Sequence, residues 1–581
     1  MLRLSMQAVT YVLGAPCQVY QQRLRDGMIG HWQWPLASIH ELLGGGWSDI
    51  LESKTIWRLS VAAIAILVYL VFHGRNVEKA KAPYAGYRSF WEPTFWVRLR
   101  FINGAWPIIM DGYRKYKDSM FWIRRNDRDI LILSNKYVDE LRAIPDEKLS
   151  GFEADVENLR GPYYLDVILR SNLHTRSLNQ KMSPNLQAYV DIVRDELAHA
   201  LKSEMPESEN WTEVPIGDFL LRIIARISAR FIVGLPLCRN EEWLRVSTVV
   251  GVNVFTTVLI LRELPPFLRP LHPVIVRCLP SWHRLLENLR VARSLIAEVL
   301  EQYTLNKREG KVNYDEAASP LLLWMSENGS NSLERDPVNL AHRMIFLGLG
   351  SIHTTASQAA HAIHDLTARP ELIIPLREEL EQVLCTEGGW GKSALMKLWK
   401  LDSFMSESQR VNPPALTVFH RLAMEPMTLS DGTYLPKGTF IAMAAASILL
   451  DPDVVPNPEK FDAFRNYRER LEPGESTRHQ YAMVDKDHLH FGHGRHACPG
   501  RALAVNELKL ILGSFLLNYD LKYPEGKGRP ANQTVDEIVF ADPKATLLIR
   551  KLSQCGRRRC DGKTLHCLMI QDLSEGAPIY T

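Results

Sequence analysis

The sequence predicts a mainly α-helical fold with small β-sheets, and three observations support this prediction. Apolar residues recur at i, i+3 and i+4 over long stretches, which is typical of amphipathic helices. These stretches lie at 186–201, 218–231, 286–303, 338–366 and 502–517. Strand signals are fewer and shorter, at 129–133, 427–429 and 439–443, and the last two flank turn residues that indicate a hairpin. A hydrophobic content of 46% and a charged content of 23% are those of an ordinary globular protein.

The chain of 581 residues divides by composition into five segments. Residues 95–552 carry the helical periodicity and are expected to form one large domain. Before it we expect an N-terminal extension of unassigned role at 1–54, a transmembrane anchor at 55–73 and a linker at 74–94. Residues 553–581 are polar and irregular, and we expect them to form a tail outside the core.

The expected anchor rests on one apolar run. Leu59–Phe72 holds 14 residues without a charge, somewhat short of the ~20 that span a bilayer, and extension back to Ile56 includes Arg58, which can snorkel to the interface. Basic residues that follow the run favour a cytoplasmic position for the main domain. They are His73, Arg75, Lys79, Lys81 and Arg88. A buried core helix is the alternative that the sequence leaves open.

Charge and cysteine usage exclude some classes of partner. A net charge of +3 without a long Lys/Arg run gives no indication of a nucleic-acid partner. Eight cysteines, mostly single, favour a reducing compartment over a disulfide framework. Cys555, Cys560 and Cys567 cluster near the end of the chain, but without the paired C-x2-C spacing of a zinc site.

The most informative motif is Phe491–Gly500, which reads F-G-H-G-R-H-A-C-P-G. It places Cys498 in a glycine-rich loop directly before an expected helix. Backbone N–H groups and the positive end of a helix stabilise a thiolate, and glycines let the backbone lie close to a flat cofactor. The loop therefore predicts a thiolate ligand to a haem iron.

Two further constellations precede this loop. Glu407 and Arg410 are three residues apart in a helical pattern and can form a pair on one face, which Arg465 could extend into a buried cluster. Gly348 and Gly350 weaken a long apolar helix by about 1 kcal/mol each, which indicates a bend or the close approach of something flat. Thr354 could then bond a carbonyl or a bound oxygen. The alternative is a helix crossing between small residues.

Over roughly residues 85–550 the chain resembles the cytochrome P-450 family of haem-thiolate monooxygenases. Phe491, Gly494, Cys498 and Gly500 match the cysteine motif F-x-x-G-x-R-x-C-x-G. The E-x-x-R motif is matched by Glu407 and Arg410, the arginine after it by Arg465, and the oxygen-binding helix by Gly350, Thr354 and Thr355. The resemblance implies the cytochrome P-450 fold behind an N-terminal transmembrane helix. It also implies haem (iron protoporphyrin) with Cys498 as the axial metal ligand.

Some positions depart from the family pattern. His496 holds the place of the arginine that binds a haem propionate, and Arg495 could share that role. His353 replaces the acidic residue before the threonine, and a histidine can also relay protons. The propionate-binding arginine of the third family helix is not clear among His174, Arg176 and Lys181, and Arg421 is the better candidate.

The resemblance implies a mechanism and partners. An NADPH-cytochrome reductase would supply electrons, and Thr354 with His353, Thr355 and Gly350 would form the catalytic set that handles protons. The substrate would be an apolar small molecule, selected near Phe346, Leu347, 416–419 and 252–268. Stretches around Glu407 and Cys498 resemble fungal oxidases of diterpenes and indole diterpenes, so we expect a terpenoid or related secondary metabolite. The family's anchored members imply a single-pass protein of the endoplasmic reticulum membrane with its main domain in the cytoplasm.

Two other functions stay open at this point. One is a haem-thiolate isomerase or dehydratase that needs no reductase, which His353 in place of the acid makes worth testing. The other, from a different class, is a haem-binding sensor without catalysis. Dependence on NADPH and dioxygen separates the first from a monooxygenase, and measured turnover excludes the second.

Overall fold

The computed structural model describes residues 79–163, 171–264, 266–311 and 319–552, together with two short strand segments at 559–560 and 563–564. The expected extension at 1–54 and the expected anchor at 55–73 lie outside the described residues. So do most of the expected tail and its cysteine cluster.

Helices make up most of the described part, as predicted. They are α6 (Thr94–Tyr116), α7 (Val138–Leu141), α8 (Gly151–Asn158), α10 (Leu173–Arg176), α11 (Leu186–Glu204), α12 (Ile216–Ile232), α13 (Glu241–Glu263), α14 (His272–Arg277), α15 (Pro280–Arg308), α16 (Leu321–Asn328), α17 (Ser332–Arg335), α18 (Pro337–Thr367), α19 (Ile373–Glu387), α20 (Lys392–Lys397), α21 (Trp399–Val411), α22 (Ala445–Ile448), α23 (Arg465–Leu471) and α24 (Arg501–Asn518). Each of the five stretches with helical periodicity is a helix, longer than expected by a few residues.

The strands are short and form small sheets. They are β1 (Met120–Arg124), β2 (Asp129–Leu133), β3 (Leu149–Ser150), β4 (Thr212–Pro215), β5 (Val418–Ala423), β6 (Met427–Thr428), β7 (Tyr434–Leu435), β8 (Phe440–Met443), β9 (Tyr519–Lys522), β10 (Gln533–Val535), β11 (Ile538–Phe540), β12 (Thr546–Lys551), β13 (Arg559–Cys560) and β14 (Lys563–Thr564). The largest sheet has the order β1-β2-β8-β5-β3, and a three-stranded sheet has the order β4-β12-β9. The other three are two-stranded pairs, β6-β7, β10-β11 and β13-β14.

One predicted strand pairing is wrong. The segments at 427–429 and 439–443 were expected to form a hairpin with each other. In the structure β6 pairs with β7 across the turn at Gly432, where φ is +85°. β8 instead pairs with β2 and β5 in the five-stranded sheet. The reason is hydrophobicity: all four residues of β8 are buried, so they belong in a sheet interior rather than in a surface hairpin.

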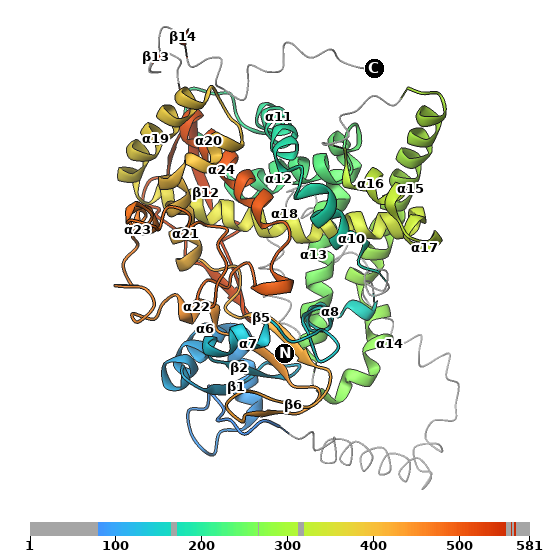
Figure 1. Cartoon of the computed structure of the whole chain (residues 1–581), viewed down its shortest axis with the longest axis vertical. Helices are drawn as coiled ribbons and strands as arrows, with labels where there is room; N and C mark the ends of the chain where they lie inside the picture. The colour runs from blue at the N-terminus through green and yellow to red at the C-terminus, as the bar shows by residue number, and fades with distance from the viewer. Residues whose placement is uncertain are drawn as a thin grey trace, which may run out of the picture.

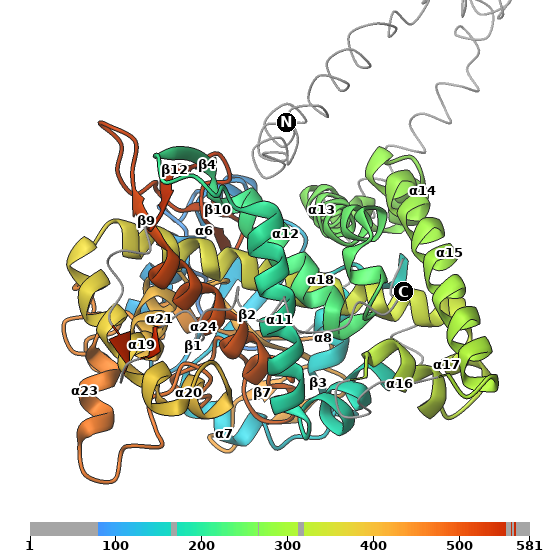
Figure 2. The same ribbon diagram turned by 90° about the horizontal axis from the view of Figure 1, so that it is seen from above.

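Helix α18 is the central element of the helical part (Figure 1). Asp336 caps its N-terminus by accepting a hydrogen bond from the backbone N–H of Asn339 at 3.1 Å, and Pro337 occupies the first turn. The helix is buried over most of its 31 residues and packs against α12, α13, α15, α21 and α24. Figure 2 shows α18 from above with these helices around it. Helix α24, which begins directly after the cysteine loop, is thus one of the helices packed on α18.

Helix α13 is the one described helix that is long and apolar enough to cross a membrane, with a mean hydropathy of 1.8. Its apolar window is 67% buried inside the protein, and the helix packs against α12, α15 and α18. These contacts are those of a core helix.

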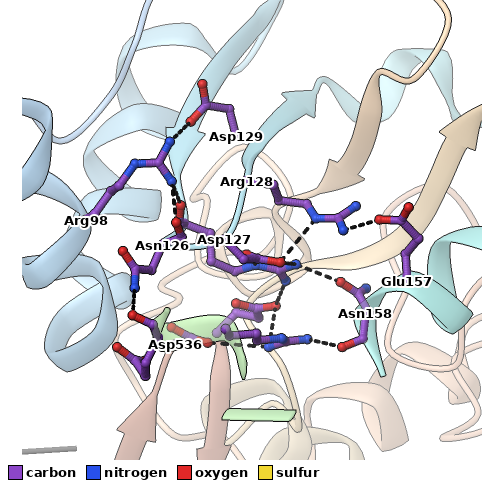
Figure 3. A network of polar contacts seen from close by, with 12 residues as sticks. Arg98, Asn126, Asp127, Arg128, Asp129, Glu157, Asn158 and Asp536 are labelled. Atoms are coloured by element: carbon purple, nitrogen blue, oxygen red, sulfur yellow. Dashed lines mark hydrogen bonds and ion pairs between the residues drawn. The ribbon is translucent and has the colours of Figure 1, made fainter. Parts of the chain in front are cut away.

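A buried network of charges fixes the C-terminal end of α13 (Figure 3). Arg125, in the turn between β1 and β2, is fully buried and donates to Asp127 (2.7 Å), Glu537 (2.6 Å) and Asn158 (2.9 Å). Arg262 of α13 donates to the carbonyl of Asn158 at 2.9 Å. Four segments distant in sequence therefore meet here, namely the β1–β2 turn, α8, α13 and the β10–β11 turn.

Candidate active site

The cysteine loop is a tight turn that needs its glycines. Gly492 and Gly494 have φ of +70° and +72°, a region that favours glycine. A Cβ added to Gly494 would lie 2.9 Å from the Cβ of Arg142, closer than side-chain contacts allow. The N–H of Cys498 donates to the carbonyl of Phe491 at 2.7 Å and closes the loop. These contacts hold the Cys498 thiol at the start of α24.

The surroundings of Cys498 have opposing effects on the pKa of its thiol. Burial raises the thiol's pKa, because the charged thiolate loses water. The backbone N–H groups of Gly500 and Arg501 hydrogen-bond the sulfur, and the charge of Arg501 lies nearby; all three lower the pKa. The net shift is upward. A cation beside the sulfur would reverse that shift, so the thiol is suited to binding a metal ion as thiolate.

The part of α18 with the two glycines has an open face. Gly350 and Thr354, one turn apart, are exposed on a helix that is otherwise mostly buried. A Cβ added to Gly350 would meet no atom within 4 Å. Thr354 Oγ1 donates to the carbonyl of Gly350 at 2.7 Å, which holds the hydroxyl against the helix. Thr355 is buried and does not share this face.

His353 points elsewhere than the sequence interpretation assumed. Its Nε2 lies 3.0 Å from the carbonyl oxygen of Thr248 on α13. A carbonyl can only accept, so Nε2 donates its hydrogen to α13 and not toward the Thr354 hydroxyl. Burial lowers the pKa of the ring. The structure thus brings Thr354 and Gly350 together and engages His353 in a contact between helices.

Arg421 is cationic, His496 can become so, and both side chains lie beside the cysteine loop at the start of α8. A Cβ added to Gly151 would lie 3.0 Å from both Arg421 and His496, so the two side chains converge there. Arg421 is buried and forms no ion pair with any described residue; burial lowers its pKa to about 10. His496 Nε2 lies 2.6 Å from Asp146 Oδ1. Arg495 is exposed on the outer side of the loop.

The other propionate candidates are engaged elsewhere. Arg176 donates to Glu334 at 2.5 Å and to Ser330 at 3.2 Å. The His174 ring is buried, and its Nδ1 lies 3.1 Å from Arg343. Lys181 is also buried. Arg421 is therefore the candidate whose charge lies next to the cysteine loop and free of a carboxylate partner among the described residues.

Glu407 and Arg410 form the buried pair that the sequence predicts. The guanidinium donates twice to the carboxylate, at 2.7 and 2.8 Å, and both side chains are at most 5% exposed. Arg410 also donates to the carbonyls of Pro458, Leu449 and Lys460. Arg465 joins more loosely, with its Nε 3.7 Å from Glu407. The pair thus ties α21 to the segment that leads toward the cysteine loop.

Tyr481 connects this pair's helix to the loop, and the sequence analysis missed it. Its hydroxyl accepts from Gln409 at 3.1 Å, and its N–H donates to Asp402 at 2.8 Å. Its ring meets Phe491 edge-on with 5.6 Å between centroids. The signal available in the sequence was only an aromatic residue ten positions before a motif phenylalanine, which is too weak to single out.

The arrangement fits a flat, anionic, iron-containing cofactor. Cys498 offers the sulfur, Gly350 leaves space over α18, and Arg421 offers a buried cation that has no carboxylate partner among the described residues. Among the described residues no group of three or more His, Cys, Asp or Glu could hold a metal ion. The site is consistent with an iron that takes one ligand from the protein and its other ligands from a macrocycle.

A depression of about 450 Å³ lies beside the cysteine loop. It is lined by Ser183, Thr477, Gln480, Ala482, Met483, Pro499, Arg501 and Ala502. In the sequence, Pro499 and Arg501 lie on either side of Gly500 and directly follow Cys498. The loop therefore comes near the protein surface here.

Comparisons with known proteins agree with this geometry. The family model described as Cytochrome P450 matches residues 106–549. A cytochrome P450 monooxygenase of Emericella nidulans is 45% identical over 85% of this chain and 92% of its own length. An ent-kaurene oxidase of Gibberella fujikuroi is 40% identical over 86% of this chain and 98% of its own length. A cytochrome P450 monooxygenase of Penicillium paxilli is 34% identical over 90% of this chain and 98% of its own length. With the family model covering most of the chain and relatives this similar along nearly their whole length, the chain belongs to the cytochrome P450 family and is a monooxygenase of that family.

Proposed function

We propose that this monooxygenase oxidises an apolar terpenoid or related secondary metabolite, with electrons from an NADPH-dependent reductase, at the endoplasmic reticulum membrane. The observation that carries the proposal is the combination of Cys498 at the N-terminus of α24 with the open face of α18. The first provides a sulfur that could bind a metal, and the second provides open space at Gly350 on a helix that packs against α24. Similarity to the ent-kaurene oxidase supports the class of substrate.

Cofactor binding is assigned to residues around the loop. Cys498 is the axial ligand, and the N–H groups of Gly500 and Arg501 stabilise its negative charge. Arg421 and His496 bind the propionates, which would give Arg421 the anionic partner that its buried position favours. Phe491 and Gly494 shape the loop, and Arg495, which is exposed, could share the role of His496.

Glu407, Arg410 and Arg465 have a structural role in this proposal. They fix α21 and the segment that follows it, and through Tyr481 they support the loop that presents Cys498.

The protons required for oxygen chemistry are handled on α18. When bound, the haem supplies the activation of dioxygen and the insertion of one oxygen atom into a C–H bond. Thr354 keeps its hydroxyl at the open face through its bond to the Gly350 carbonyl. There the hydroxyl oxygen can accept a hydrogen bond from water and pass a proton on. Thr355 packs beneath this face and keeps the helix in place.

The apolar surroundings support an apolar substrate. Phe346 and Leu347 on α18 are partly buried, one turn before Gly350. Leu416 and Phe419 are buried in the segment that leads to Arg421. A site bounded by these residues and α13 would have mostly apolar walls, which is typical of a small-molecule site.

The depression beside the cysteine loop supports docking of a reductase. Electron transfer favours a short path to the cofactor, and Pro499 and Arg501, which line this depression, follow Cys498 within three residues in the chain.

A membrane location is supported by exposed aromatic residues at the start of the described part. Phe90 and Trp91 are 91% and 86% exposed, and Phe95 and Trp96 about half. Aromatic side chains of this kind favour the membrane–water interface. They follow the apolar run Leu59–Phe72 after a short basic linker, so an anchor with a cytoplasmic domain would place them near the bilayer.

The test is expression of the full chain with a reductase in a host fed candidate terpenoids, followed by metabolite profiling. We expect an oxygenated product that requires NADPH and dioxygen, and a reduced carbon monoxide band typical of haem-thiolate. Cys498→Ala should abolish both, while Cys278→Ala, at an exposed free cysteine, should change neither. A product formed without NADPH would favour the isomerase or dehydratase, and a band retained in Cys498→Ala would refute the assignment of the ligand.

A further inference from the structure

Helices α13 and α18 are joined by a hydrogen bond that involves His353. Its Nε2 donates to the carbonyl oxygen of Thr248 at 3.0 Å. A carbonyl inside a helix normally accepts from the N–H four residues later, and its second lone pair remains available to such a side chain. The bond therefore fixes the His353 ring against α13 without breaking that helix.

Gly251 provides the space that the ring occupies. A Cβ at this position would lie 2.1 Å from Nε2 and 2.4 Å from Cδ2 of His353. Glycine inside a helix costs about 1 kcal/mol relative to alanine, and the backbone of Gly251 has no positive φ that would require glycine. The close approach of the His353 ring is thus the reason that the structure offers for glycine here.

His353 directly precedes Thr354 on α18. Successive residues of an α-helix point about 100° apart, so side chains at 353 and 354 leave α18 in different directions. His353 points to α13, while Thr354 lies on the open face with Gly350. Gly348 and Gly350 weaken α18 just before this point. A fixed side chain at 353 therefore restrains the rotation of this turn, and with it the direction of the Thr354 hydroxyl.

Helix α13 is held at its other end by the buried charge network. Arg262 donates to the carbonyl of Asn158 and lies 3.4 Å from Asp536. Thr248 and Arg262 are about 21 Å apart along the helix at 1.5 Å per residue. The stretch between them contains Gly251 and Phe255, and α13 packs against α18. The bond from His353 to Thr248 joins the two helices at the N-terminal part of α13.

We propose that His353 is a positioning residue that sets the spacing between α13 and α18 and directs Thr354 to the open face. This positioning role replaces the proton-relay role that the sequence suggested for His353. The inference rests on the proposed function, because the open face is taken as the site of oxygen chemistry. In this proposal Gly251 is needed because a residue without a Cβ leaves space for the His353 ring.

Four variants of the full, haem-loaded chain test this inference. His353→Gln keeps a donor near the position of Nε2 but cannot take up a proton, whereas His353→Ala removes the donor. Gly251→Ala displaces the ring while His353 remains. Gly217→Ala on α12 is the matched control, since a Cβ there meets no atom within 4 Å. The reduced carbon monoxide band measures correct assembly of each variant.

Two measurements distinguish a positioning role of His353 from a role in proton relay. The first is the ratio of dissociation constants for 4-phenylimidazole and imidazole, which reports the depth of the site and needs no substrate. The second is the share of NADPH electrons released as hydrogen peroxide, followed from about pH 6 to about pH 9, across the range where a histidine titrates.

We expect His353→Ala and Gly251→Ala to change the ratio and the peroxide share by roughly fivefold, the factor that one hydrogen bond supports. His353→Gln should stay near the wild type with an unchanged pH profile, and Gly217→Ala should match the wild type. A glutamine variant as impaired as alanine, or an unchanged Gly251→Ala, would overturn the proposal. Loss of the carbon monoxide band in the wild type would instead refute the proposed function.

Discussion

Removal of Glu407 should destabilise the protein more than almost any other single change. The carboxylate accepts two bonds from Arg410 and one from the N–H of Asp462 at 2.7 Å. In Glu407→Ala the Arg410 charge stays buried, held by three backbone carbonyls but without a counter-charge. Breaking a buried pair in this way costs about 3–5 kcal/mol. Domains have a free energy of unfolding of about 5–15 kcal/mol, so the change removes about a fifth of it or more.

Arg410→Ala should cost a similar amount for a different reason. It leaves Glu407 with the N–H of Asp462 and with Arg465 at 3.7 Å, but the carbonyls of Pro458, Leu449 and Lys460 lose their donor. The double variant removes both charges and should cost about as much as either single variant. The coupling energy between the two positions is then also about 3–5 kcal/mol.

The assay is urea unfolding of the haem-loaded chain in detergent, followed by tryptophan fluorescence and by the carbon monoxide band. Asp111→Ala is the control, because its pair with Lys115 on α6 is more than half exposed and should contribute under about 0.5 kcal/mol. Single variants that cost less than about 1 kcal/mol would refute the reasoning, because a buried pair broken on one side must cost more. A double variant whose cost equals the sum of the singles would refute it as well.

Three further predictions concern the loop and the pH dependence of stability. Gly494→Ala should lower the fraction of protein that shows the carbon monoxide band, because its added Cβ meets Arg142; Gly526→Ala, with a similar φ of +71° and open space, should lower it less. Hydrogen bonds from Ser171, the backbone N–H of Ser330 and Arg176 outweigh the effect of burial and lower the pKa of Glu334 to about 2. Melting temperatures should therefore fall as the pH drops below about 4.5, and Glu334→Gln should reduce that fall. Burial raises the pKa of Glu263 to about 8, so ionisation of this carboxyl opposes folding. The free energy of unfolding should therefore decrease as the pH rises from about 4.5 to about 8 and level off above that, and Glu263→Gln should remove this decrease. An equal loss in both glycine variants, or unchanged pH curves in either glutamine variant, would contradict these expectations.

Local patterns predicted the helices well, because a buried helix face repeats its apolar residues every three to four positions. Helix α18 follows this rule over its whole length, including a proline in its first turn. The strands followed local patterns less well. β8 is correct as a strand, but it pairs with β5 and with β2. Because β2 lies more than 300 residues earlier, no nearby turn residue could indicate that second pairing.

The candidate site shows the same difference between contacts within one helix, which local patterns predict, and contacts between distant segments, which they do not. Glu407 and Arg410 are three residues apart, and the predicted pair is confirmed as a contact. The partner of His353 is Thr248, and its space comes from Gly251; both belong to another helix, so a sequence motif centred on Thr354 could not reveal them. Motif positions thus indicated which residues matter, and tertiary packing decided where each side chain points.

The buried charge network has a consequence for how the chain is made. Arg125 donates to Glu537, which follows it by 412 residues. At about 5–20 residues per second, a ribosome needs roughly 20–80 seconds to synthesise that interval. Throughout this time the Arg125 guanidinium has no C-terminal partner, and the turn between β1 and β2 cannot take its final surroundings. Completion of the domain therefore waits for its last strands, and truncation before residue 537 should leave a nascent chain that chaperones retain.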